Sequence, residues 1–470
     1  MPTVPIDGVR RGHRRAAVFA LVLCGALAST SVGCGGGGGD GTSDEQILVD
    51  ALRNFGRFTP VRLDTARLAR AARAGRPIRL PFALEGGGSV ARTVRLAPRN
   101  LRAADLNEIV LKDGDAGEGH TIPLPPPSTY QGRVHDGGVA VFTITDRAVE
   151  GSMLVSPEGW SFIEPLEPQL RFNGVDPDTR RRLLKKYNHL VYNVRDALDG
   201  TPLHDDLGTE RGPVPSPPPP EPLVLSIVAD GDAALWRAYP LDSVMPFWLK
   251  QEAILNSVDW LYNCVEPEAN AGNAHADCGN EFDAGTNAFQ ARVRIDRLEV
   301  WTSGGPTSPL RAGVLQQSIG MTHQASPPCC GDPHSAGRSN LVHFFSGADL
   351  DAPGLAAGEF GVNYYGPLCS VTTSAGKCHH ALSQIVPGRA FRATAFHQHQ
   401  LVAHEIGHNN GAYEAFAGGD YVCWLFGQQC GQSIMASNPI SGLNLFRHTE
   451  DDAARMGVLL ADELERAPSP

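Results

Sequence analysis

A proline-rich run at residues 212–222 constrains this chain more than any other feature, because it cannot enter a helix or a central strand. Proline lacks a backbone N–H and holds φ fixed, so the run predicts an extended spacer between two folded parts. The cysteines agree with a boundary there, since none lies between Cys34 and Cys264 and eight lie from Cys264 to Cys430. We therefore expect one domain over residues 46–211 and a second over residues 223–470.

The first residues are expected to be an export signal rather than part of the fold. A basic cluster at residues 10–15 precedes an apolar run at residues 16–28, which is too short to span a bilayer. Residues 31–34, Ser-Val-Gly-Cys, resemble a bacterial lipobox, in which the cysteine is acylated. We expect residues 1–33 to be a lipoprotein signal peptide and Cys34 to anchor the protein in the cell envelope, at the outer membrane or cell surface. Residues 34–45 would form a flexible glycine-rich tether, and ordinary signal-peptidase cleavage near Cys34 is the alternative.

The net charge and the cysteine content limit which partners the chain can bind and indicate the compartment in which it folds. With 40 Lys and Arg against 51 Asp and Glu, the chain carries a net charge of −11 and has no broad basic face, so no nucleic-acid partner is expected. An even number of cysteines in an exported domain predicts disulfides. Their pairing stays open, but the adjacent Cys329 and Cys330 must seek different partners.

Local hydrophobic patterns predict a β-rich first domain and an α/β second domain. In the first domain, strands are expected at residues 139–144, 153–155 and 160–163. In the second, a buried strand at residues 223–229 is followed by a helix at residues 247–263 and an alternating strand at residues 289–301. Strand, helix and strand in this order favour a layered α/β architecture.

The residues best suited to chemistry are His404, Glu405 and His408. Histidines four residues apart lie on one face of a helix and can bind one metal ion, while Glu405 lies beside them within reach of a water on that metal. Zinc lowers the pKa of such a water to about 7 and polarises a scissile carbonyl, and a glutamate can carry the proton to the leaving amine. The alternative is a chance occurrence of this short pattern on a surface helix.

Two downstream features argue against chance. Gly411 lies where the helix would have to end, because glycine accepts the positive φ that turns the chain sharply at a helix C-terminus. Met435, in residues 433–436, would lie in a short tight turn beneath the metal ligands. A methionine turn below three zinc ligands is the signature of metzincins.

On these residues the second domain resembles the catalytic domain of reprolysin or ADAM-type metzincin peptidases. The likeness covers residues 404–409 with Gly411, the turn at residues 433–436, and stretches at residues 298–302 and 361–370. It implies a twisted mixed sheet with an active-site helix and a Met-turn, a bound Zn²⁺, and protein or peptide substrates. The stretch at residues 361–370 would be the edge strand that binds substrate as an added strand.

The first domain resembles the reprolysin propeptide. The matching stretches are short and lie at residues 130–134, 150–151, 162–166 and 189–192. The resemblance implies a zymogen in which the propeptide inhibits the catalytic domain. The family's inhibitory cysteine is impossible here, because no cysteine lies between Cys34 and Cys264. The acidic sequence around His204, Asp205 and Asp206 offers weak candidate ligands for latency, with a solvated acidic loop as the alternative.

The third zinc ligand departs from the family pattern. The position three residues after Gly411, where the family has histidine, holds Glu414. A carboxylate oxygen binds zinc at about the same distance as an imidazole nitrogen, ~2.0–2.2 Å, so we expect Glu414 to be the ligand. Asp420 is one alternative, and a solvent-facing Glu414 with an inactive site is the other. His397 lies seven residues before His404 and shares its face, and His399 has no ligand spacing to the motif. Both are expected to be solvated or to line the cleft rather than to bind metal.

These features predict an exported zinc metalloendopeptidase. A non-catalytic zinc-containing surface module for binding or adhesion is the principal alternative, and a zinc amidase acting on a non-protein substrate is another. A cut near Arg211, or in the basic cluster at residues 180–186, would separate the catalytic domain from the lipid and release it in soluble form.

Overall fold

The computed structural model describes residues 43–53, 55–114, 118–135, 137–155, 158–196, 223–262, 291–304, 341–347, 361–363, 380–385 and 394–409. The predicted signal peptide, the site of lipidation at Cys34, the run at residues 212–222 and the eight later cysteines lie outside these ranges. The described chain is mixed α/β and mostly strand. None of its helices within these ranges is long and apolar enough to cross a membrane.

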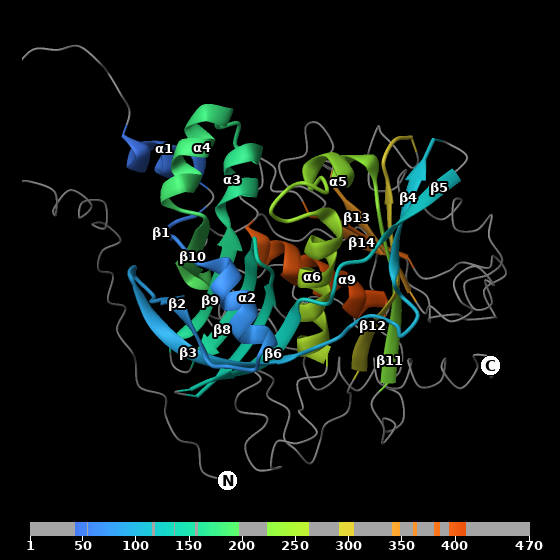
Figure 1. Cartoon of the computed structure of the whole chain (residues 1–470), viewed down its shortest axis with the longest axis horizontal. Helices are drawn as coiled ribbons and strands as arrows, with labels where there is room; N and C mark the ends of the chain where they lie inside the picture. Colours follow the sequence, from blue (N-terminus) through green and yellow to red (C-terminus); the bar gives the residue numbers. More distant parts are fainter. Residues whose placement is uncertain are drawn as a thin grey trace, which may run out of the picture. The chain divides into compact units, whose positions relative to one another are not determined.

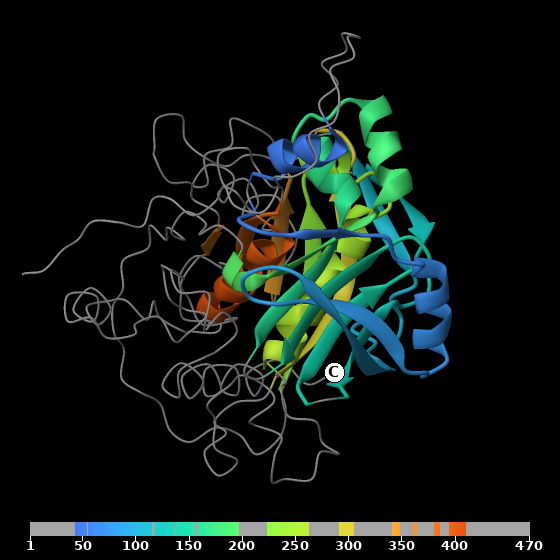
Figure 2. The ribbon, with the colours of Figure 1, turned by 90° about the vertical axis from the view of Figure 1, so that its left-hand side faces the viewer.

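Strands of the N-terminal part form an eight-stranded sheet in which every pairing is antiparallel. In spatial order its strands are β1 (Thr59–Val61), β10 (His189–Asn193), β9 (Gly159–Pro165), β8 (Val149–Val155), β7 (Val139–Ile144), β6 (Thr129–Val134), β3 (Ser89–Pro98) and β2 (Ile78–Ala83). The predicted strands at residues 139–144, 153–155 and 160–163 are confirmed, and Figure 2 shows the twist of the sheet. Gly138 has a φ of +108° at the β6–β7 turn, where a Cβ would meet the carbonyl oxygen of Leu154.

Short helices lie around this sheet. They are α1 (Asp44–Ala51), α2 (Thr65–Arg73), α3 (Leu166–Phe172) and α4 (Pro177–Lys186), and a 3₁₀ turn, η1 (Val194–Asp196), follows β10. Helix α4 begins at Asp176, whose side chain accepts from the N–H groups of Asp178 and Thr179. The basic cluster at residues 180–186 therefore lies within a helix, and its Leu183 is fully buried. A protease would have to unfold α4 to cut there, so this part of the predicted cleavage region is a poor substrate.

The second sheet has seven strands and a parallel centre. In spatial order they are β14 (Gly361–Asn363), β15 (His380–Gln384), β13 (Leu341–Ser346), β11 (Leu223–Gly231), β12 (Ala291–Trp301), β4 (Glu108–Asp113) and β5 (Glu118–Pro123). Strands β15, β13, β11, β12 and β4 are parallel, while β14 and β5 are antiparallel to their neighbours. The strands predicted at residues 223–229 and 289–301 are confirmed, and β14 lies at the edge of the sheet.

Two helices of the C-terminal part lie between the sheets (Figure 1). The predicted helix α6 (Phe247–Tyr262) contacts β6, β7 and β8 on one side and β12 on the other, and it packs against α9 (Ala395–Asn409). The β4–β5 hairpin comes from before residue 212 but pairs with β12 of the second sheet. The described residues from Asp44 onward thus group as one compact unit, and a domain boundary at residues 212–222 stays a prediction.

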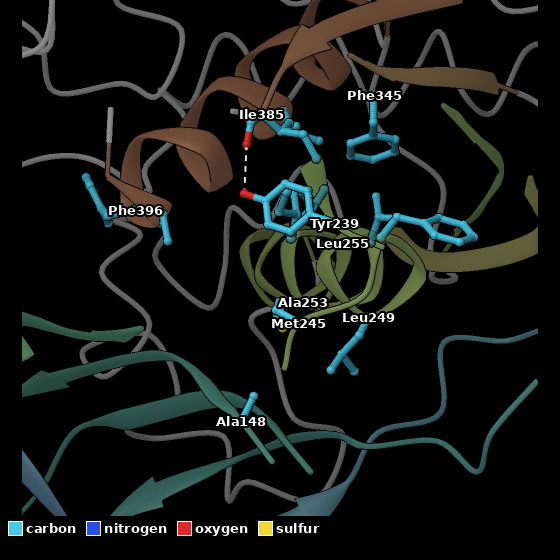
Figure 3. Packing of buried hydrophobic residues seen from close by; sticks show 14 of the residues in the cluster. Ala148, Tyr239, Met245, Leu249, Ala253, Leu255, Phe345, Ile385 and Phe396 are labelled. Carbon is cyan, nitrogen blue, oxygen red and sulfur yellow. Dashed lines mark hydrogen bonds between the residues drawn. The ribbon is translucent and has the colours of Figure 1, made fainter. Parts of the chain in front are cut away.

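One hydrophobic core connects these elements. Figure 3 shows residues from both parts of the chain in it, among them Ala148 at the start of β8 and Leu249 on α6. At the end of the short helix α5 (Ala233–Ala238), the hydroxyl of Tyr239 donates to the carbonyl oxygen of Ile385 over 3.2 Å. This bond fixes the chain at Ile385, just beyond β15.

Candidate active site

Helix α9 carries His404, Glu405 and His408, as the sequence predicted. Its first turn begins after Thr394, whose hydroxyl accepts from the N–H of His397 over 3.4 Å and whose carbonyl accepts from the N–H of Gln398 over 3.2 Å. The helix backbone places residues 404 and 408 one turn apart on the same face. This is the arrangement that two histidine ligands of one zinc ion require.

Glu405 is almost completely buried, with 2% of its surface exposed. Its apolar neighbours Val402, Ala403 and Ile406 are fully buried where α9 packs against α6 and β15. A carboxylate in such surroundings is shielded from bulk water, which suits a group that must exchange a proton with a reacting water.

The remaining predicted site residues cannot be placed. The side chains of His404 and His408, and the whole of Gly411, Glu414 and Met435, lie outside the described part of the chain. Among the residues that are described, no three His, Cys, Asp or Glu side chains gather closely enough to hold a metal ion. The fit to zinc therefore rests on the helical spacing of two imidazoles and the adjacent buried carboxylate.

The N-terminal end of α9 is held by the eight-stranded sheet. The N–H of Ala395 donates to Oε2 of Glu164 over 2.8 Å, and the N–H of Phe396 donates to the hydroxyl of Tyr192 over 3.3 Å. These backbone groups have no partner within the helix, so acceptors on β9 and β10 satisfy them. The sheet thereby fixes where α9 begins.

His399 forms a second connection to that sheet. Its Nε2 lies 2.9 Å from Oε1 of Glu150 on β8, and its Nδ1 lies 2.7 Å from Oγ of Ser257 on α6. The same Glu150 oxygen accepts from Nζ of Lys250 over 2.6 Å, and His399 is fully buried. His399 was expected to be solvated or to line the cleft, and its burial shows that the first of these expectations was wrong. The apolar residues around Lys250 in its predicted helix were the available sign of a buried polar cluster, whereas Glu150 lies outside the strands that the sequence predicted.

Burial sets the charges of this cluster. Burial raises the pKa of Glu150, but Lys250 and His399 lower it further, so the net shift is downward and the carboxylate is ionised. Burial lowers the pKa of His399, which keeps its ring neutral. Burial also raises the pKa of Glu164 to about 8, against the lowering effect of Lys250, and this carboxyl is largely protonated near pH 7.

Comparisons with known proteins find likeness in structure only. No family model and no curated protein sequence matches the chain. The structure is similar to the crystal structure of metalloproteinase-II from Bacteroides fragilis, at 10% sequence identity and a TM-score of 0.41, over 82% of this chain and 91% of that chain.

Proposed function

We propose that the protein is an exported zinc-dependent metalloendopeptidase that hydrolyses peptide bonds. The observation that carries the proposal is helix α9, which brings His404, Glu405 and His408 onto successive turns and buries Glu405. The resemblance of the surrounding sequence to reprolysin-type metzincins supports the same function.

His404, His408 and Glu414 would hold the zinc. When bound, zinc makes a water acidic enough to attack near neutral pH and polarises the carbonyl of the scissile bond. Glu405 takes the proton from the attacking water on its carboxylate and delivers it to the nitrogen of the leaving amine. Because α9 is anchored at both its first turn and His399, Glu405 keeps a fixed position for this transfer.

Strand β14 would orient the substrate. Among the described strands it pairs only with β15 and forms the edge of the described sheet, which supports a role as the strand to which an extended peptide adds. A peptide added there as a further strand would be bound mainly through its main chain.

Hydrolysis of casein and zinc analysis of the purified protein test the proposal, with Glu405→Ala as the matched control. We expect zinc in both proteins and at least ~100-fold slower hydrolysis in the variant, because removal of a general base costs about 10²–10⁴ in rate. Bound zinc without hydrolysis in the parent, both before and after the chain is cut between residues 197 and 222, would favour the alternative, a non-catalytic surface module.

We also propose that Cys34 anchors the protein in the bacterial envelope and that residues 46–211 restrain the enzyme. The contacts of this segment with α9 support the second point, since they reach Ala395, Phe396 and His399 on the active-site helix. Cys34→Ser should move the protein from the membrane fraction to the soluble exported fraction.

A further inference from the structure

Buried ion pairs join the two halves of the described chain. Most of them place the cation on the N-terminal half, and Lys250 with Glu150 is a pair of the opposite sense. We call residues 43–196 the N-terminal part and the described residues from 223 to 409 the C-terminal part. Cations of the N-terminal part meet carboxylates of the C-terminal part in buried pairs, which are Arg99 with Asp259, Arg102 with Glu252, and Lys112 with Asp230 and Glu299. The two surfaces are therefore complementary in charge.

Arg99 and Arg102 bind carboxylates of helix α6. Arg99 holds Asp259 through two bonds, with Nε 2.7 Å from Oδ2 and Nη2 2.8 Å from Oδ1. Arg102 holds Glu252 in the same way, at 2.5 Å and 3.0 Å. The side chain of Asp259 is fully buried and that of Glu252 is 2% exposed. Two-point arginine–carboxylate pairs combine strength with a fixed geometry.

Lys112 forms ion pairs with two strands of the second sheet. Its Nζ lies 3.0 Å from Oδ2 of Asp230 on β11 and also contacts Glu299 on β12. Burial lowers the pKa of Lys112, but these two carboxylates raise it further, so the net shift is upward and the lysine is charged. Removing Lys112 would leave two buried carboxylates on neighbouring strands without their shared cation.

Main-chain bonds add to these pairs. Residues Val110, Leu111 and Lys112 of β4 pair in parallel with Glu299, Val300 and Trp301 of β12. Further along β12, the N–H of Ile295 donates to the carbonyl of Leu101 over 2.7 Å, and the N–H of Ala103 donates to the carbonyl of Ile295 over 2.8 Å. The N-terminal part thus supplies strands to the second sheet and also the cation that neutralises two of its buried carboxylates.

Aromatic packing also joins the two parts. Trp160 on β9 meets Trp260 on α6 edge to face, with ring centroids 5.3 Å apart, and both are over 90% buried. A separated C-terminal part would expose Trp260 and the edge of β12 to water. Exposed apolar groups and an open strand edge favour association with the surface that covered them.

We propose that the N-terminal part stays bound to the C-terminal part when the chain is cut between residues 197 and 222, so that the cut enzyme is a two-chain complex. The release expected from the sequence would then need a further step that separates the two parts. That the complex is an enzyme rests on the function proposed above, but the binding of the two chains does not.

The test cuts the protein and asks whether its chains separate. A recognition site for a sequence-specific protease is inserted into residues 197–222 of Glu405→Ala, which prevents self-digestion and makes the result independent of activity. After the cut, size-exclusion chromatography at about 0.15 M salt should give one peak that contains both chains. Two separate peaks of folded chains would overturn the proposal.

Variants then test the charge pairs. In the cut protein, Arg102→Met should weaken the binding of the two chains at least ~tenfold, because it leaves Glu252 without its partner in the complex. The matched control is Arg181→Met, whose side chain is 73% exposed in an ion pair on α4, and it should change binding less than twofold. Equal binding of the two chains in both variants would show that the arginine pairs do not hold them together. If Arg102→Met does not fold before the cut, the elution of the cut Glu405→Ala protein alone decides whether the two chains stay bound.

Discussion

Replacement of Glu164 by glutamine should make the protein more stable in neutral and alkaline solution. Glu164 is 2% exposed, and its carboxyl accepts from the N–H of Ala395 over 2.8 Å and from Nε2 of Gln169 over 3.3 Å. Glutamine has the same shape and keeps an oxygen that can accept from Ala395. It removes the charge that the buried position disfavours.

The size of the effect follows from the pKa of Glu164. Burial raises this pKa from 4.5 to about 8 in the folded protein. Between these values the folded state holds a proton that the unfolded state has released, so the free energy of unfolding falls as the pH rises. The slope is about 1.4 kcal/mol per pH unit, which gives about 2.5 kcal/mol between roughly pH 5.5 and 7.5.

Urea unfolding of Glu405→Ala, with and without Glu164→Gln, measures this slope. The difference in unfolding free energy between the two proteins should grow by about 2.5 kcal/mol over that pH range, because all other titrating groups cancel. Glu108→Gln, which replaces an exposed carboxylate on β4, is the control and should leave the slope unchanged. A Glu164→Gln protein whose stability falls with pH as steeply as that of its parent would refute the reasoning.

Three further predictions concern the metal, the buried lysine and the cysteines. Glu414→Ala should lose most bound zinc. Glu414→His should keep zinc and lower the pH optimum of hydrolysis, because a neutral ligand makes a zinc-bound water more acidic. Full zinc and activity in Glu414→Ala would contradict the ligand assignment. Lys250→Met leaves Glu150 buried without its cation and should cost about 3–5 kcal/mol in urea unfolding, against less than about 0.5 kcal/mol for the exposed Lys185→Met. Thiol titration of denatured, unreduced protein should find the eight cysteines of residues 264–430 oxidised, and several free thiols would disprove the predicted disulfides.

Local sequence patterns were sufficient to predict the helices and strands that bury a continuous face. Strand β7 and strand β11 are short apolar runs, and helix α6 repeats apolar residues at helical spacing, so each was predictable without knowledge of its neighbours. The helix that carries His404 and His408 was predictable because their spacing is useful to a metal only on a helix. In each case the signal lies within one element.

Contacts between distant segments were not predictable in this way. The β4–β5 hairpin has an ordinary strand pattern, and nothing in it indicates pairing with β12, which lies nearly two hundred residues later. His399 was expected in solvent or in the cleft because it has no ligand spacing to the motif, and its partner Glu150, 249 positions away, gave no local sign of the bond. The partner of a buried charge depends on the packing of whole sheets, which hydrophobic periodicity does not specify.

Helix α6 shows why these distant contacts matter for the site. Its Asn256 donates to the carbonyls of Tyr130 and Phe142 in the eight-stranded sheet, and the next residue, Ser257, binds His399 on α9. His399 precedes His404 by five residues, about 7.5 Å along the helix axis. A displacement of the eight-stranded sheet would therefore act on the active-site helix through α6 and through Glu150 at once. Activation by loss of the N-terminal part would have to preserve the position of α9 without these bonds, whereas activation within a two-chain complex keeps them.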